Sequence, residues 1–87
     1  MTADAGYCEV ADSQLDALEA GSDPALCNAV LDACELILGH PSKAQALSSA
    51  LATEAGVILR LVVVGHPPVK VFWSTQGPRI EAVLPHP

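Results

Sequence analysis

The spacing of apolar residues divides the chain into a helical first half and a strand-rich second half. In the first half, two adjoining apolar stripes at helical spacing form one broad face. Ser22 or Asp23 can cap this segment, Pro24 suits its first turn, and Gly39-His40-Pro41 closes it. We therefore predict a helix here, whose apolar stripes are Leu26, Val30, Ala33 and Ile37, and Cys27, Leu31, Cys34 and Leu38.

Two shorter elements precede this helix. The segment Tyr7–Ala11 roughly alternates between apolar and polar residues, which predicts a first strand. Asp12 or Ser13 then suits the N-cap of a short helix, and Gly21 ends that helix.

The second half changes character. The segment Ser42–Gly56 is rich in Ala, Ser and Leu, and its pattern leaves open both a helical turn or two and a loop. After it, Val57–Val64, Val69–Thr75 and Arg79–Leu84 have the composition of strands and are joined by short turns. Connections this short require neighbouring strands to run antiparallel.

These elements predict one α+β domain over residues 1–87: a short N-terminal strand, a helix pair and a three-stranded antiparallel meander. The helix pair needs an apolar partner, and one face of the sheet supplies it. Alternation along the second strand of the meander places Lys70 on the other face of the sheet from Val71 and Trp73. We expect Arg60, Lys70 and Arg79 to share the face of the sheet that the helices leave open.

Composition narrows the classes of function. Apolar residues make up 51% of the chain and only one each of Phe, Trp and Tyr is present, so the core must be aliphatic. Residues 1–42 hold eight acids and no Lys or Arg, whereas residues 43–87 hold four cations and two acids, a balance of +2. That balance attracts nucleic acid only weakly. The sequence shows no membrane span and no secretion signal, so we expect a cytoplasmic protein.

The three cysteines favour a structural interpretation. Cys27 and Cys34 lie seven residues apart on the predicted helix, about 10 Å along its axis, which is too far for a disulfide. Zinc-type spacings such as CxxC are missing. We interpret all three, Cys8 included, as small buried apolar residues, and we predict neither a metal nor a cofactor.

The order of elements resembles the RelE/ParE superfamily of toxins from bacterial type II toxin–antitoxin pairs. The resemblance covers nearly the whole chain through short motifs. It rests on Tyr7–Ala11 followed by a helix pair, the apolar helix ending at His40-Pro41, the strand with Arg60, and the stretch Val69–Trp73 leading by a tight turn to Arg79–Leu84. It implies a toxin that a cognate antitoxin protein holds in check.

The resemblance also implies candidate residues. In the RelE and YoeB branch, which cuts messenger RNA on the ribosome, Lys70 and Arg60 match basic residues that stabilise the scissile phosphate. His86 matches a C-terminal histidine, and Glu54 can stand for an acidic base. Pro87 stands where YoeB-like members have a tyrosine, and a lysine lacks the guanidinium fork that suits phosphate. These departures weigh against efficient RNA cleavage, and the ParE branch, which poisons DNA gyrase through protein contacts, remains compatible with the chain; the sequence leaves both branches open.

A non-catalytic protein-binding module on the same fold is the alternative from another class. The strand Val57–Val64 has apolar residues on both faces, so a surplus face would suit an antitoxin segment or a second copy of the chain, unless residues 42–55 cover it. The interrupting Arg60 fits either a paired structural role or a role in binding. A lone Trp73 favours the core over base stacking. The candidate partner-binding residues are Arg60, Lys70, Arg79 and Trp73.

Overall fold

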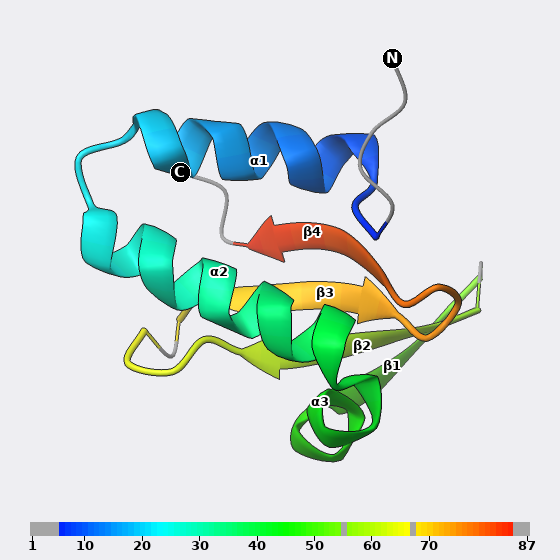
Figure 1. Ribbon diagram of the computed structural model, residues 1–87. Coiled ribbons are helices and arrows are strands. Elements are labelled where there is room, and N and C mark those ends of the chain that lie inside the picture. Colours follow the sequence, from blue (N-terminus) through cyan, green and yellow to red (C-terminus); the bar gives the residue numbers. More distant parts are fainter. Residues whose placement is uncertain (1–5, 55, 67, 85–87) are drawn as a thin grey trace.

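The computed structural model describes residues 6–54, 56–66 and 68–84. In these ranges, three helices cover one face of a four-stranded antiparallel sheet (Figure 1). The strands lie side by side in chain order. The elements are α1 (Glu9–Ala20), α2 (Pro24–Gly39), α3 (Pro41–Leu47), β1 (Ser49–Thr53), β2 (Gly56–Val62), β3 (Lys70–Ser74) and β4 (Arg79–Leu84). The predicted α+β class is confirmed.

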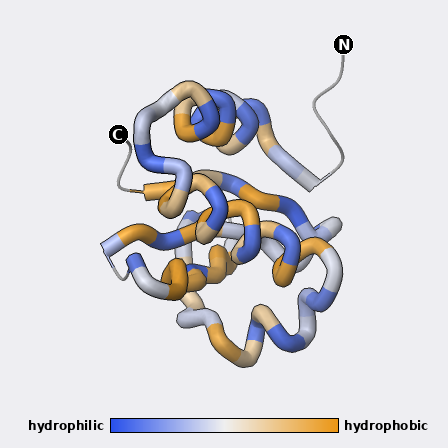
Figure 2. The backbone as a smooth tube through the Cα atoms, turned by 60° about the vertical axis from the view of Figure 1, so that its left-hand side comes forward, coloured by the Kyte–Doolittle hydropathy of each residue, from blue (hydrophilic) through white to orange (hydrophobic). Residues whose placement is uncertain are grey.

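The helix α2 follows the sequence prediction closely. The side chain of Asp23 accepts a hydrogen bond from the backbone N–H of Leu26 at 3.0 Å, and Pro24 occupies the first turn. The first N–H groups of a helix have no partner within the helix. Asp23 provides an acceptor for one of them, and Pro24 has no N–H that would need one. The helix ends at Gly39, and His40 is its C-cap. Polar and apolar residues alternate along the helices of the tube in Figure 2.

The start of the chain differs from the prediction. The strand expected at Tyr7–Ala11 is wrong, since α1 already begins at Glu9. Cys8 is its N-cap: the Sγ atom accepts a hydrogen bond from the N–H of Ala11 at 3.4 Å. The predicted cap at Asp12 or Ser13 therefore lies inside the helix. Of the expected strand, Tyr7 keeps a single parallel bridge to Ile80.

The segment after α2 contains two elements. Its first part forms the short helix α3, and its second part forms β1, which pairs with β2 from Ser49↔Arg60 to Thr53↔Gly56. The predicted helix pair and three-stranded meander thus become three helices and a four-stranded sheet in the described ranges. The residues of β1 are mostly Ala and Ser, which have low strand propensity, so pairing with the Val- and Leu-rich β2 determines their conformation.

The predicted meander of β2, β3 and β4 is confirmed. Arg60 pairs with Phe72 and Val62 with Lys70 across β2 and β3, and Val71 pairs with Val83 across β3 and β4. The register shifts between Phe72 and Trp73, which pair with Ala82 and Ile80, so Glu81 is an extra residue in β4.

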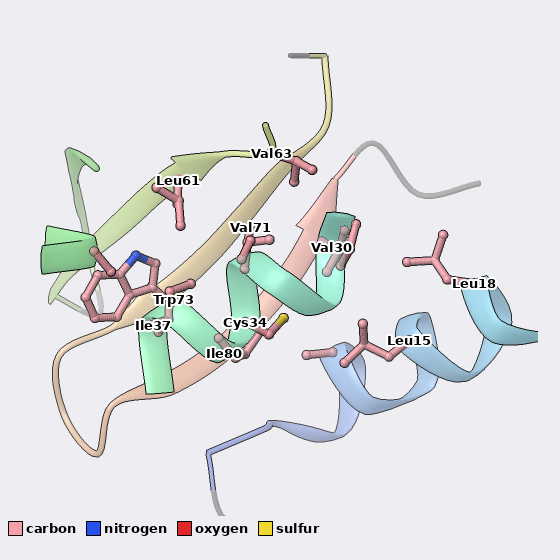
Figure 3. Close-up of a cluster of buried hydrophobic side chains, with 14 of the residues drawn as sticks. Leu15, Leu18, Val30, Cys34, Ile37, Leu61, Val63, Val71, Trp73 and Ile80 are labelled. Atoms are coloured by element: carbon pink, nitrogen blue, oxygen red, sulfur yellow. The ribbon is translucent and has the colours of Figure 1, made fainter. Parts of the chain in front are cut away.

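The core lies between the helices and one face of the sheet, and it is aliphatic apart from Trp73. Figure 3 shows Val30, Cys34 and Ile37 of α2 facing Val71 and Trp73 of β3. All five side chains are fully buried. The indole N–H of Trp73 donates to Ser48 Oγ at 3.1 Å, which satisfies its one polar atom. Across the described ranges, no helix has the length and apolar character needed to cross a membrane.

The outer edge of β4, which we call the closed edge, is covered by the start of the chain. The N–H of Ile80 donates to the carbonyl of Gly6 at 2.6 Å, and the N–H of Cys8 donates to the carbonyl of Ile80 at 3.0 Å. The thiol of Cys8 donates to the carbonyl of Glu81 at 2.8 Å. Gly6 has a φ of +97°, a backbone conformation that favours glycine.

A side chain of α1 completes the closed edge. Gln14 is only 4% exposed, and its Oε1 atom accepts a hydrogen bond from the N–H of Val83 at 2.6 Å. These contacts give partners to backbone groups that would otherwise face solvent or another chain.

Candidate functional site

The face of the sheet opposite the helices, which we call the open face, presents both apolar and cationic side chains. In β3, buried residues alternate with partly exposed ones, so Lys70, Phe72 and Ser74 point away from the core as predicted. Pairing across the strands extends this face over the sheet. Its members are Ser49, Leu51, Ile58, Arg60, Val62, Lys70, Phe72, Ser74, Arg79, Ala82 and Leu84.

The pair Arg60 and Lys70 lies on the two central strands of the open face, with Lys70 at the end of the face where β2 and β4 finish. Arg60 lies opposite Phe72, and Lys70 lies two residues before Phe72 in β3, so the two cations are diagonal neighbours with Cα atoms about 7–8 Å apart. Arg60 is half-buried and forms no hydrogen bond or ion pair with any residue in the described ranges. Lys70 Nζ donates to the carbonyl of Pro68 at 3.3 Å. The expectation that these two residues share a face is confirmed.

The third predicted cation, Arg79, has an anionic partner. Its Nε atom lies 3.3 Å from an oxygen of Glu81, and Ser74 Oγ donates to the same oxygen at 3.3 Å. Arg79 is therefore partly neutralised. The positive charge without a counterion in the described part of the open face belongs to Arg60 and Lys70.

The remaining catalytic candidates do not join this pair. Glu54 lies just beyond β1, at the end of β2 where Gly56 begins, whereas Lys70 pairs with Val62 at the other end of β2. Six residues of strand separate those ends by roughly 20 Å, so Glu54 and Lys70 cannot act on the same atom. His86 lies outside the described residues.

Trp73 belongs to the core, as the sequence favours. It is fully buried on the helix side of β3, so it cannot contact a partner at the surface and leaves the set of candidate partner-binding residues. The interpretation of the cysteines holds for Cys27 and Cys34, which are buried, whereas Cys8 is half-buried and serves as a cap.

The thiol of Cys34 is unsuited to nucleophilic chemistry at neutral pH. Burial raises its pKa to about 11, although a hydrogen bond with the side chain of Tyr7 lowers it somewhat. A protonated thiol is a poor nucleophile and metal ligand. Among the described residues, no group of three or more His, Cys, Asp or Glu side chains could hold a metal ion.

An apolar groove that the sequence did not reveal lies between α2, the end of α3 and the end of β2. It encloses about 740 Å³ and is lined by Ala29, Asp32, Ala33, Leu36, Leu47 and residues 61–65. Leu47 and Val64 are 62% and 89% exposed, and Asp32 is the one charged side chain in the lining. These residues come from separate segments of the sequence, so no local pattern predicts the groove.

Comparisons with models of protein families, with curated proteins and with solved structures find no match to this chain.

Proposed function

We propose that this chain is a protein-binding domain whose open face docks an acidic, amphipathic segment of another protein. The observation that carries the proposal is the placement of Arg60 and Lys70, as cations without anionic partners in the described residues, within a partly apolar sheet face. This proposal develops the alternative in which the fold works as an interaction module.

The apolar part of the open face supports a protein ligand. Phe72 and Ile58 are only partly covered, and Val62 and Leu84 are 45% and 42% exposed. The helices all pack on the other face (Figure 1), so these side chains border solvent. Contiguous exposed apolar surface of this kind is typical of interaction sites.

Charge determines the kind of segment that fits. A partner that covers Arg60 removes its guanidinium from water, and an unpaired buried cation is strongly unfavourable. The partner must therefore place a carboxylate against Arg60, and a second one against Lys70. Apolar residues between those carboxylates would cover Phe72.

Peptide display on the immobilised full chain tests the proposal without a known partner. We expect selected peptides to carry Asp or Glu interleaved with apolar residues. Arg60→Glu should weaken their binding by at least about tenfold, because it places like charges in contact. Lys43→Glu makes the same change of charge at an exposed position of α3 and should alter binding less than about twofold.

Two results would contradict the proposal. One is enrichment of peptides without acids. The other is enrichment of peptides that bind the Arg60→Glu variant as well as the wild type, which would place them elsewhere, for example in the apolar groove.

A toxin of the RelE/ParE type is the second candidate, with an antitoxin as the protein that covers the open face. The observation that favours it is that the two cations assigned by the resemblance lie on neighbouring strands of one face. The separation of Glu54 from Lys70 favours, within this candidate, a ParE-like action through protein contacts over RNA cleavage.

Induced expression in bacterial cells separates the candidates. Growth arrest supports the toxin. Unimpaired growth contradicts the toxin, and only the protein-binding domain then remains as a candidate. If growth stops, cleaved transcripts indicate the ribonuclease branch and supercoiling defects indicate the gyrase branch. Lys70→Ala and His86→Ala should abolish arrest only in the ribonuclease case.

A further inference from the structure

The outer edge of β1, which we call the free edge, is exposed, regular and without residues that block pairing. Four of its five residues are exposed, and only Leu51 is partly covered. Its pairing with β2 runs without a bulge from Ser49 to Thr53. The strand contains no charged residue and no proline, the usual means by which proteins block an edge.

The register shows which backbone groups the free edge offers. The hairpin closes with the pair Thr53↔Gly56, and the tight connection between these residues requires them to be the hydrogen-bonded kind of pair. Hydrogen-bonded pairs alternate with non-hydrogen-bonded ones along an antiparallel ladder. The N–H and C=O groups of Leu51 therefore face β2, and those of Ala50 and Ala52 face outward.

We propose that a second copy of the chain pairs antiparallel with β1 across a two-fold axis at Leu51, which joins two sheets into one of eight strands. The sequence Ser-Ala-Leu-Ala-Thr is nearly the same in both directions. In this register Ala50 of one copy lies opposite Ala52 of the other, and these are the residues whose backbone groups face outward. The two-fold axis produces two such Ala50–Ala52 pairs. Each pair exchanges two hydrogen bonds, so the contact contains four.

The side chains fit the same register. Ser49 lies opposite Thr53, so small hydroxyl residues meet at both ends of the contact. The two copies of Leu51 form the central, non-hydrogen-bonded pair, where side chains approach most closely. Because Leu51 pairs with Ile58 on the open face, this contact also makes the open faces of the two copies continuous.

The sequence of β1 is nearly the same in both directions, as antiparallel pairing of two identical strands favours. Pairing with an unrelated strand would not require this symmetry, so we favour a second copy as the partner. Five residues bury a small area, so the expected dimer is weak and reversible rather than obligate. The inference depends on β1 alone and not on the partner proposed for the open face.

Cysteine cross-linking of the full chain tests the register. In Leu51→Cys the two Cα atoms lie about 4.5 Å apart in the dimer, within the range that a disulfide spans. In the control Thr53→Cys the same atoms are displaced by four residues, roughly 14 Å along the strands. Under mild oxidation we expect Leu51→Cys to form a covalent dimer at least tenfold faster than Thr53→Cys, with the wild type giving the background of the native cysteines.

Sedimentation equilibrium tests the backbone contacts. Ala52→Pro removes one outward N–H per copy and hence two of the four hydrogen bonds, so it should weaken dimerisation by at least about tenfold. Ala52→Val keeps the N–H and should dimerise like the wild type. A wild type that stays at 9.0 kDa up to millimolar concentration overturns the inference. So does a dimer that tolerates Ala52→Pro, or equal cross-linking at positions 51 and 53.

Discussion

The closed edge of β4 and the free edge of β1 differ in how their outward backbone N–H and C=O groups find hydrogen-bond partners. At the closed edge, Gly6, Cys8 and Gln14 supply partners for outward backbone groups of β4. At the free edge, no residue in the described ranges performs that role for Ala50 and Ala52. One edge is therefore completed within the chain, and the other is left for water or another strand.

Stability should depend on the closed edge of this small sheet, and association should depend on its free edge. A paired edge loses stability when its partners change, because buried donors are then left without acceptors. At an unpaired edge, the outward backbone groups of the monomer already form hydrogen bonds with water. Substitutions there should therefore change the stability of the monomer little. Perturbations at the closed edge should therefore appear in folding, and perturbations at the free edge should appear in association.

Proline substitution should give the largest difference between the edges. Val83→Pro removes the N–H that Gln14 accepts from and should lower the free energy of unfolding by about 3 kcal/mol or more. Ala52→Pro removes an outward N–H on an edge strand and should lower it by less than about 1 kcal/mol. Denaturant unfolding of dilute protein measures both, and equal losses would show that the edges do not differ.

The contact from α1 should come next in magnitude. Gln14→Leu keeps the approximate shape of a buried side chain but leaves the N–H of Val83 without an acceptor, which should lower the free energy of unfolding by about 2 kcal/mol. Gln45→Leu makes the same replacement at an exposed site on α3 and should be nearly neutral. Chemical denaturation of the pair provides the measurement, and a neutral Gln14→Leu would mean that the closed edge contributes little.

The smallest effect should come from the thiol that caps α1 and bonds to β4. Cys8→Ala removes both hydrogen bonds of the side chain and should lower the free energy of unfolding by about 1 kcal/mol. Cys8→Ser should retain or increase stability, because serine is a better N-cap than cysteine. Thermal unfolding of the two variants distinguishes these outcomes. A serine variant as unstable as the alanine variant would imply that packing, not capping, determines the role of Cys8.

Sequence reasoning succeeded where the signals are local. Asp23 and Pro24 mark the start of α2 because a cap and a first-turn proline act within one helical turn. The alternation of residues in β2 and β3 places Arg60 and Lys70 on one face because side chains in a strand have a period of two. The main surface of the candidate site was predictable for this reason.

It failed where distant contacts determine the structure. Cysteine is an uncommon N-cap, and Cys8 takes that role while its thiol bonds to Glu81, 73 residues away. The strand β1 consists largely of residues with low strand propensity and forms because β2 is available to pair with it. The apolar groove likewise arises from three elements that meet only in the fold.

The hydrogen bond between Trp73 and Ser48 gives this protein a built-in optical probe. Trp73 is the single tryptophan of the chain, and it lies fully buried next to the residue that leads into β1. Its fluorescence emission should be blue-shifted in the native state and should move to longer wavelength when solvent reaches the indole. Loosening of the core beside β1 can therefore be followed by light alone, without any label.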